Sequence, residues 1–298
     1  MAKLQPAVQT IFLQTPVLPS GNNQLYVDIG QCVSILSRRG YPQGCNWAVG
    51  GIKFLTASLA TITTQKIPES WVTVSAWKKG KKLWNEMNDL VLDNNPSLNP
   101  KYYDFKVSMD SNQLFSANLL PQRYDGSTLT PYSNGDWNHS TIQLPNDPTS
   151  GTTTEKFLMM CGPTTSNRAS IIEGYQQSRA LVSSPEPDLP AGYDDNWMVQ
   201  LFDMGENYEE IAQDIAAEND DPPYDRDVYI GSIEPVIHDV SIVSGTTVGS
   251  QTRIPGGMFP CGLIKFVISN ETTTNFLIQI DLVPGTNRGY MALPMDEM

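Results

Sequence analysis

Residues 276–282 read FLIQIDL, and every second position from Phe276 to Leu282 carries a large apolar side chain. Side chains two residues apart lie on the same face of a β-strand, so this spacing predicts a strand that buries one face. Residues 24–29 (QLYVDI) and residues 236–243 (VIHDVSIV) alternate in a similar way. Strand-forming sequence therefore occurs near both ends of the chain.

Further strand-like segments occur along the chain, and turn-forming residues separate them. They cover residues 8–14, 47–64, 103–109, 139–144, 156–161 and 262–269. Together with 22 glycines and 22 prolines, they predict eight or more short strands. Few helical patterns interrupt them, which favours an all-β fold, an antiparallel sandwich or jelly roll, over an α/β fold. We expect residues 1–298 to form a single domain with helical insertions and long loops.

Two segments are predicted to be helices inserted into this framework. Ser75 is expected to cap a helix that ends near Asp93, because apolar residues recur there at helical spacing opposite a lysine-rich face. The apolar stripe of this helix consists of Ala76, Trp77, Gly80, Leu83, Trp84, Met87, Leu90 and Val91. The second predicted helix covers residues 195–218. Long polar loops are predicted within residues 122–154 and 183–195.

The net charge of −13 is divided unequally along the chain. Residues 1–110 carry 11 Lys and Arg against 7 Asp and Glu, whereas residues 111–298 carry 8 against 25. This asymmetry has two interpretations. Either an acidic face keeps the protein in solution, or acidic loops line the outside of an assembly whose more basic part faces inward.

The cysteines and the apolar runs indicate in which cellular compartment the chain is made. Cys32, Cys45, Cys161 and Cys261 are scattered without a close pair, so we expect reduced, mostly buried thiols. No uninterrupted apolar run reaches the length of a membrane-spanning helix, and the N-terminus lacks the pattern of a secretory signal. We therefore expect cytosolic synthesis and no membrane insertion.

Two basic clusters are candidate binding sites for nucleic acid or for a neighbouring subunit. The first is Lys78, Lys79, Lys81 and Lys82, and the second is the pair Arg38 and Arg39. An isolated helix favours acids in its first turn and bases in its last, whereas the predicted helix has its lysines early. The lysines would then serve DNA phosphates, acids of another subunit, or import machinery. The alternative is a solvated polar face.

Catalytic and metal-binding patterns are sparse. The two histidines, His139 and His238, stand in different strand-like contexts, and no GxSxG, HExxH, Walker A or GxGxxG sequence accompanies them. We expect no enzymatic activity and no cofactor. One weak calcium candidate is an acidic cluster, which does not match the spacing of a calcium-binding loop and is otherwise read as solvated or paired acids. Its residues are Glu218, Asp220, Asp221, Asp225 and Asp227.

Six phrases of the sequence occur in an order that resembles a known family. They are LYVDIGQCVSILSRRGYPQGCNWAVGGIKF (25–54), WVTVSAWKKGKKLWNEM (71–87), FSANLLPQ (115–122), GDWNHSTIQLPN (135–146), QQSRALV (176–182) and ENDDPPYDRDVYIG (218–231). In these phrases the chain resembles the capsid proteins of small circular single-stranded DNA viruses that encode a replication initiator. The resemblance spans roughly residues 17–235.

The resemblance implies a jelly-roll coat subunit that assembles with copies of itself into an icosahedral shell around single-stranded DNA. It also implies residence in the virion, with synthesis in the host cytoplasm, nuclear import as an option, and a receptor on the host surface. One departure is that many such proteins begin with an arginine-rich arm, whereas this chain has only Lys3 in its first 37 residues. The shell-forming role is therefore better supported than genome binding.

Two alternatives remain open from the residues alone. The first is a lectin-like β-sandwich that uses loops bearing Trp137 or Trp197, together with the acidic cluster, to hold a glycan. The second is a glycosidase with two loop carboxylates, although no particular pair is singled out. Particle size separates the first alternative from a coat protein.

Overall fold

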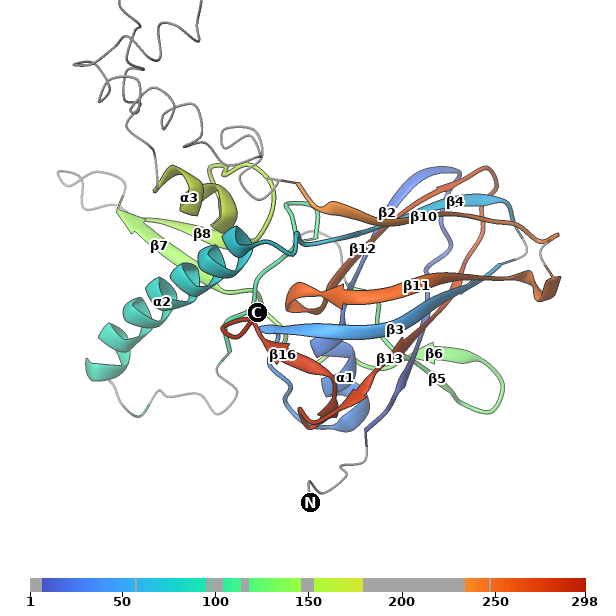
Figure 1. Cartoon of the computed structure of the whole chain (residues 1–298), viewed down its shortest axis with the longest axis horizontal. Coiled ribbons are helices and arrows are strands. Elements are labelled where there is room, and N and C mark those ends of the chain that lie inside the picture. The colour runs from blue at the N-terminus through green and yellow to red at the C-terminus, as the bar shows by residue number, and fades with distance from the viewer. Residues whose placement is uncertain are drawn as a thin grey trace, which may run out of the picture.

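The computed structural model describes residues 7–56, 58–94, 97, 104–113, 118–145, 153–178, 234–246 and 248–298. Its framework is mainly β, with two antiparallel sheets that face one another and helices placed outside them (Figure 1). The predicted second helix at 195–218 and the acidic cluster from Glu218 to Asp227 lie outside the described residues, as does Trp197.

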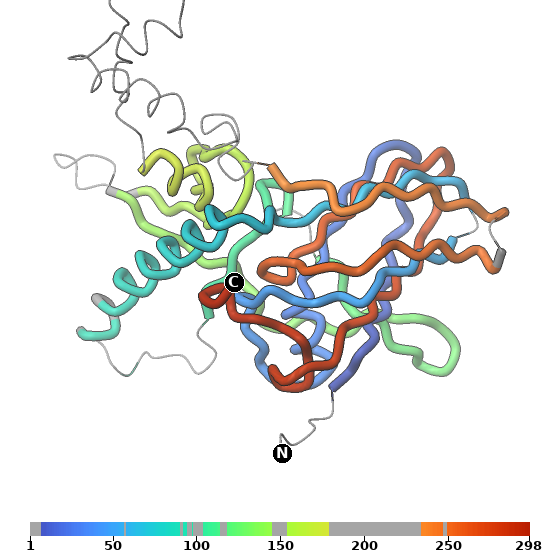
Figure 2. The backbone as a smooth tube through the Cα atoms, viewed as in Figure 1, coloured from blue at the N-terminus to red at the C-terminus, as the bar shows by residue number. Residues whose placement is uncertain are grey.

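Each sheet has a four-strand path. The first sheet has the order β1 (Thr10–Gln14), β13 (Leu277–Leu282), β3 (Cys45–Leu55) and β11 (Gln251–Phe259), and β16 (Ala292–Pro294) pairs with the beginning of β3. The second sheet has the order β10 (Val236–Val243), β4 (Ala60–Lys66), β12 (Leu263–Asn270) and β2 (Gly21–Asp28). In Figure 2 the blue strand β1 and the red strand β13 run side by side, in agreement with their antiparallel pairing.

The main hydrophobic core lies between the two sheets. Phe54 on the first sheet meets Phe266 on the second edge to face, with ring centroids 5.3 Å apart. The predicted apolar face of 276–282 is confirmed, since Ile278 and Ile280 are buried in this core. Burying large apolar side chains from two facing sheets is the principal stabilising contribution of such a sandwich.

Along the chain, the eight strands of the two four-strand paths change sheet at every step except one. That step runs from β4 to β10, which are neighbours in the second sheet although residues 67–235 separate them. The described part of this insertion contains α2 (Trp71–Asn94), β5 (Gln122–Tyr124), β6 (Leu129–Pro131), β7 (Thr141–Pro145), β8 (Thr153–Met159), β9 (Arg168–Ser170) and α3 (Ile171–Gln177). The remaining short elements are η2 (Val248–Ser250), η3 (Pro260–Gly262), β14 (Pro284–Gly285) and β15 (Gly289–Tyr290).

A second buried cluster joins this insertion to the outer face of the second sheet. Side chains alternate along β2, so Tyr26 points away from the main core that holds its neighbours Leu25 and Val27. Tyr26 shares the second cluster with Trp77 of α2 and with Phe105, whose ring centroid lies 5.9 Å from that of Trp77. The insertion therefore covers part of the sheet with its own apolar side chains.

Helix α2 begins five residues earlier than predicted, because Ser70, not Ser75, is its cap. The Ser70 hydroxyl accepts a hydrogen bond from the backbone N–H of Thr73 at 3.2 Å. The β-branched residues Val72 and Val74 are buried in the structure, and this burial outweighs their weak preference for strand. Leu83, predicted to lie in the apolar stripe, is 45% exposed, since the buried face centres on Trp77 and Trp84.

Replacing Ser70 with alanine is expected to lower the free energy of unfolding by about 1 kcal/mol, the usual cost of removing a serine cap. Ser75→Ala is the matched control and is expected to change it by less than about 0.5 kcal/mol. Urea unfolding of both variants measures the difference. A larger loss for Ser75→Ala would place the cap where the sequence alone predicted it.

Three predicted segments differ from the structure. Residues 29–37 form a helix, α1 (Ile29–Ser37), so the alternation of 24–29 stops one residue short of its predicted end. Segment 47–64 holds two strands instead of one, β3 and β4. The described part of 103–109 forms only an isolated bridge, at Ser108.

The thiols agree with their predicted state, since all four cysteines are free and buried. Among the residues that the structure describes, none of the helices is both long and apolar enough to span a membrane.

Candidate functional site

The polar centre of one end of the sandwich is Asp28, the last residue of β2. Its buried carboxylate accepts hydrogen bonds from the backbone N–H of Gln31 at 3.1 Å, Gln43 Nε2 at 2.8 Å and Trp137 Nε1 at 2.8 Å. The first of these bonds caps α1. The other two hold segments that are far apart in sequence against the end of β2.

Burial raises the pKa of Asp28 to about 6, although the three donors favour the charged form. Asp104, whose carboxylate accepts from the backbone N–H of Gln43 at 3.1 Å, also has a raised pKa because of its burial. Both acids lie beside the Gln43 backbone and side chain. The protonation of both acids therefore depends on the position of the loop that carries Gln43.

Gln43 fixes the position of the segment that follows Asp104. Its side-chain amide donates to the Val107 carbonyl at 2.9 Å and accepts from the Val107 N–H at 2.6 Å. This pair of bonds imitates one rung of a β-ladder. It holds Lys106 near Trp137, with Lys106 Nζ 4.9 Å from the centroid of the indole ring.

These segments enclose a pocket of about 780 Å³. Its walls come from the end of α1 and the loop after it, from residues 104–106, from the loop 133–137, and from the turn that carries Arg288. Its charged lining residues are Arg38, Arg39, Lys106, Arg288, Asp104 and Asp136. Tyr41 and Trp137 add aromatic surface. We call this cavity the basic pocket.

Within the described chain, none of the four cations of the basic pocket forms an ion pair within 4 Å. Arg288 instead donates to the Gly40 carbonyl at 2.7 Å and lies over the Tyr41 ring. Four cations against two carboxylates give the pocket a net positive charge in a chain whose total is −13. A concave basic surface concentrates anions.

The structure places the two predicted basic clusters differently. Arg38 and Arg39 line the basic pocket, whereas the lysines lie along α2. Lys81 pairs with Asp296 at 3.3 Å, and its charge also reaches Asp104, where it favours the carboxylate. Lys81 therefore links the helix electrostatically to the pocket.

The other three lysines are not brought to the pocket. Lys79 donates to Ser178 Oγ at 2.7 Å, and Lys82 pairs with Glu86 at 3.7 Å. Lys78 is exposed. The prediction that these four lysines line an inner or inter-subunit surface remains a prediction, because a single chain does not test it.

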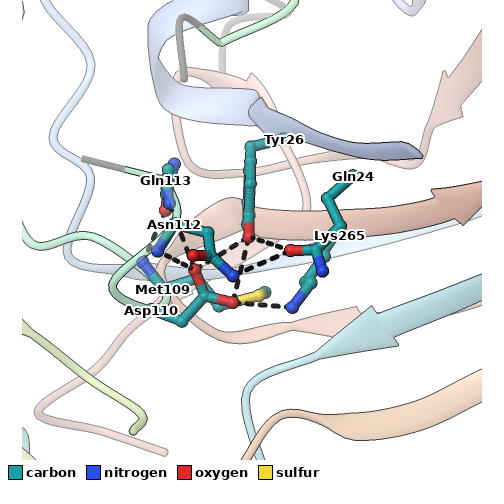
Figure 3. A network of polar contacts seen from close by, with 7 residues as sticks. All are labelled: Gln24, Tyr26, Met109, Asp110, Asn112, Gln113 and Lys265. Carbon is teal, nitrogen blue, oxygen red and sulfur yellow. Dashed lines mark hydrogen bonds and ion pairs between the residues drawn. The ribbon is translucent and has the colours of Figure 1, made fainter. Parts of the chain in front are cut away.

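A separate buried network anchors the insertion to the second sheet (Figure 3). Asp110 accepts from Lys265 Nζ at 2.7 Å and from the Tyr26 hydroxyl at 2.8 Å. Its Oδ1 also accepts from the backbone N–H groups of Asn112 and Gln113, at 2.9 and 3.1 Å. Because every oxygen has partners, this ion pair is a structural element and leaves no site for a ligand.

The two histidines lie in different surroundings. His139 is half-buried, and burial together with the charge of Lys106 lowers its pKa to about 4. His238 is also half-buried, with Nε2 3.1 Å from the Pro255 carbonyl and its ring against Phe259. In the described part of the chain, no three His, Cys, Asp or Glu residues are grouped to hold a metal ion.

Sequence reasoning found Arg38, Arg39 and Trp137 but missed Asp28, Lys106 and Arg288. The arginine pair stands out because two adjacent cations form a local pattern. Lys106 and Arg288 are isolated charges, and only the fold brings them beside α1. No short-range pattern marks such residues.

No family model matches the chain, and no curated protein or solved structure matches it significantly.

Proposed function

We propose that the chain is a viral coat protein with a jelly-roll framework, and that it assembles with copies of itself into a closed shell. The observation that carries the proposal is the strand order. Eight strands in two four-strand paths, with partners from opposite ends of the chain, suit the jelly roll, an architecture of viral capsid and lectin domains. The sequence resemblance to capsid proteins supports the same function.

An apolar stripe on β10 supports self-association. Ile237, Val240 and Ile242 are 61, 55 and 67% exposed. A bulge between Ile237 and Asp239 lets Ile237 and Val240 share one face although they are three residues apart. In the described chain β10 pairs only with β4, so it is an edge strand, and exposed apolar edge strands favour contact with another chain.

Negative-stain electron microscopy and light scattering of the purified protein test the proposal. Uniform closed particles of many copies are the expected result at low and at moderate salt. A stable monomer or dimer under every condition would contradict the shell.

Ile242→Lys is expected to raise the protein concentration needed for assembly by about tenfold or more. Burying one isoleucine contributes about 1.5–3 kcal/mol, and about 1.4 kcal/mol corresponds to a factor of ten. Leu129→Lys, which adds the same charge at an exposed apolar residue of β6, is the matched control. Light scattering against concentration measures the threshold. Equal thresholds for the two variants would exclude the β10 stripe as a contact.

The proposed content of the shell is circular single-stranded DNA, with the virion as the final location. Only Lys3 precedes Arg38 among the basic residues, so the charge of a genome would have to be balanced by cations elsewhere in the fold or by small counterions. The basic pocket offers four such cations per copy. We propose that the chain has no catalytic role. We also propose that a receptor on the host surface is a further partner.

A glycan-binding module is the second candidate, and the basic pocket favours it specifically. Trp137, Asp136 and Asn134 line one cavity, which combines an aromatic surface with carboxylate and amide groups that can bind sugar hydroxyls. This function predicts a small oligomer in solution. Retention on neutral glycans, lost on Trp137→Ala, would support it over the shell if no particles form.

A further inference from the structure

We propose that the basic pocket is a binding site for the phosphate group of a nucleotide, and that Arg38 and Arg288 are its principal ligands. The inference goes beyond the proposed shell, because a nucleotide site requires only the folded chain. It predicts binding by an unassembled subunit. It therefore stands or falls separately from particle formation.

The backbone conformation of the two arginines is the first argument. Arg38 has φ 52° and ψ 37°, and Arg288 has φ 50°, so both are in the left-handed region that favours glycine. Only four non-glycine residues of the described chain have a positive φ, namely Arg38, Ser250, Cys261 and Arg288. Two of the four line one pocket. Unfavourable backbone conformations are retained where the side chain is needed.

Helix capping explains only half of this arrangement. Arg38 follows the last residue of α1, where glycine is the usual residue and where a cation interacts favourably with the helix dipole. Arg288 lies in the turn between β14 and β15, with no helix beside it in the sequence. Its bond to the Gly40 carbonyl brings this turn to the loop after α1. Two unrelated turns thus direct strained arginines to the same cavity.

The charge of the pocket is the second argument. Arg38, Arg39 and Lys106 have no carboxylate within ion-pair distance in the described chain, and neither does Arg288. Most cations near a cavity gain by pairing, and Asp104 and Asp136 in the same lining do not supply the partners. An external anion would supply them. Guanidinium groups match phosphate oxygens in two-pronged geometry, so phosphate is the preferred anion.

The rest of the lining favours a nucleotide over free phosphate. The pocket volume of about 780 Å³ exceeds what a phosphate ion fills and lies in the range of small-molecule sites. The rings of Trp137 and Tyr41 supply flat apolar surface, on which a base can lie. Asp104 and Asp136 offer acceptors for the amino groups of cytosine or adenine. The guanidinium groups would bind the phosphate, and the carboxylates would bind the edge of the base.

Binding to the full chain carrying Ile242→Lys tests the inference without interference from assembly. The probes are deoxycytidine monophosphate, a short single-stranded oligonucleotide, inorganic phosphate and a sulfated oligosaccharide, each titrated by calorimetry at low salt. We expect the nucleotide and the oligonucleotide to bind more tightly than inorganic phosphate. Binding of both identifies a free-nucleotide site, and binding of the oligonucleotide alone identifies a strand site. Both outcomes support the proposal.

Arg38→Gly separates binding from stability. Glycine adopts the left-handed conformation freely, so the thermal midpoint is expected to stay the same or rise, while affinity for the nucleotide falls about tenfold with the lost charged contact. Arg123→Gly, at a cation of β5 outside the pocket, is the control and should leave affinity unchanged. Arg38→Gln, which keeps the side-chain bulk, serves if the glycine variant does not fold.

Three results would overturn the proposal. One is wild-type affinity for nucleotide in both Arg38→Gly and Arg288→Gly. Another is tighter binding of the sulfated oligosaccharide than of any nucleotide, with the same dependence on the two arginines. Absence of binding by every probe would also refute the site.

Discussion

Replacing Asp110 with alanine is expected to lower the free energy of unfolding by about 3–5 kcal/mol. The variant leaves the ammonium group of Lys265, a residue that is 8% exposed, without its only carboxylate partner in the described chain. It also removes the acceptor of the Tyr26 hydroxyl and of two backbone N–H groups. An uncompensated buried charge is among the most destabilising single changes.

A double-mutant cycle with Lys265→Met separates the pair from its surroundings. Lys265→Met alone leaves a carboxylate that Tyr26 and two N–H groups still stabilise, so we expect a smaller loss. The double variant should be more stable than Asp110→Ala, because no buried ammonium remains. Urea unfolding at neutral pH measures all three. Additive losses would show that the two charges do not interact.

The stability of the fold is expected to depend on the protonation of Asp28. Its pKa rises from 3.8 to about 6 on folding because the carboxyl is fully buried. The folded state therefore binds this proton more tightly than the unfolded state. The contribution of Asp28 to stability is complete below about pH 4 and is lost as pH rises through about 6, by about 3 kcal/mol in total.

Comparison with Asp28→Asn isolates this dependence. The asparagine variant is destabilised at all pH values, since its amide has one acceptor oxygen and an NH₂ group, and so cannot accept from the Gln31 N–H as well as from Gln43 Nε2 and Trp137 Nε1. Relative to it, the wild-type protein should gain about 2 to 2.5 kcal/mol between about pH 7 and pH 4, measured by urea unfolding. A constant difference across this range would mean that Asp28 keeps an ordinary pKa in the fold.

Asp281 provides a control of opposite sign. Burial opposes its ionisation, but hydrogen bonds from Gln279 and Lys53 and the charge of Lys53 lower its pKa overall. Its contribution is therefore present above its unfolded pKa and is lost as pH falls. Wild type compared with Asp281→Asn should lose relative stability in acid, where the Asp28 comparison gains it.

The framework was largely predictable because its strands have one apolar face each. The alternation of residues 276–282 predicts which face of the strand is buried, and the structure confirms that this face lies in the main core. The same rule failed at Ile29, where the apolar period of β2 continues into α1 without a break. There the helix start is marked by the Asp28 cap, a signal that the strand pattern obscured.

Strand β11 was missed for a different reason. Its sequence, QTRIPGGMF, contains proline and two glycines, which normally argue against a strand interior. The ladder to β3 skips Gly256, where an added Cβ would lie 2.0 Å from the Val49 carbonyl oxygen. Only a glycine permits this close approach. Tertiary contact, absent from the local sequence, makes the segment a strand.

The candidate site was predictable where residue type or adjacency in sequence marked its residues, as for Trp137 and the pair Arg38 and Arg39. The adjacent arginines Arg38 and Arg39 were predicted as a binding site, and they line the pocket. The KKGKK lysines form a stronger local pattern but do not line the pocket, although the charge of Lys81 acts on Asp104. Arg288 carries no local signal, because its significance comes from a left-handed turn and from Gly40, almost the whole chain away.

The insertion between β4 and β10 leaves the second sheet and returns to it at neighbouring strands, which limits where changes of chain length affect the sheet. Lys66 at the end of β4 and Val236 at the start of β10 are register partners, so everything between them leaves and re-enters the sheet at one place. Changes of length within this segment therefore leave the pairing of β4 with β10 in register. Exchange is constrained by the sheet face around Tyr26 and Lys265, which any replacement must cover, and by the contacts of the insertion with Asp28, Gln43 and the main core.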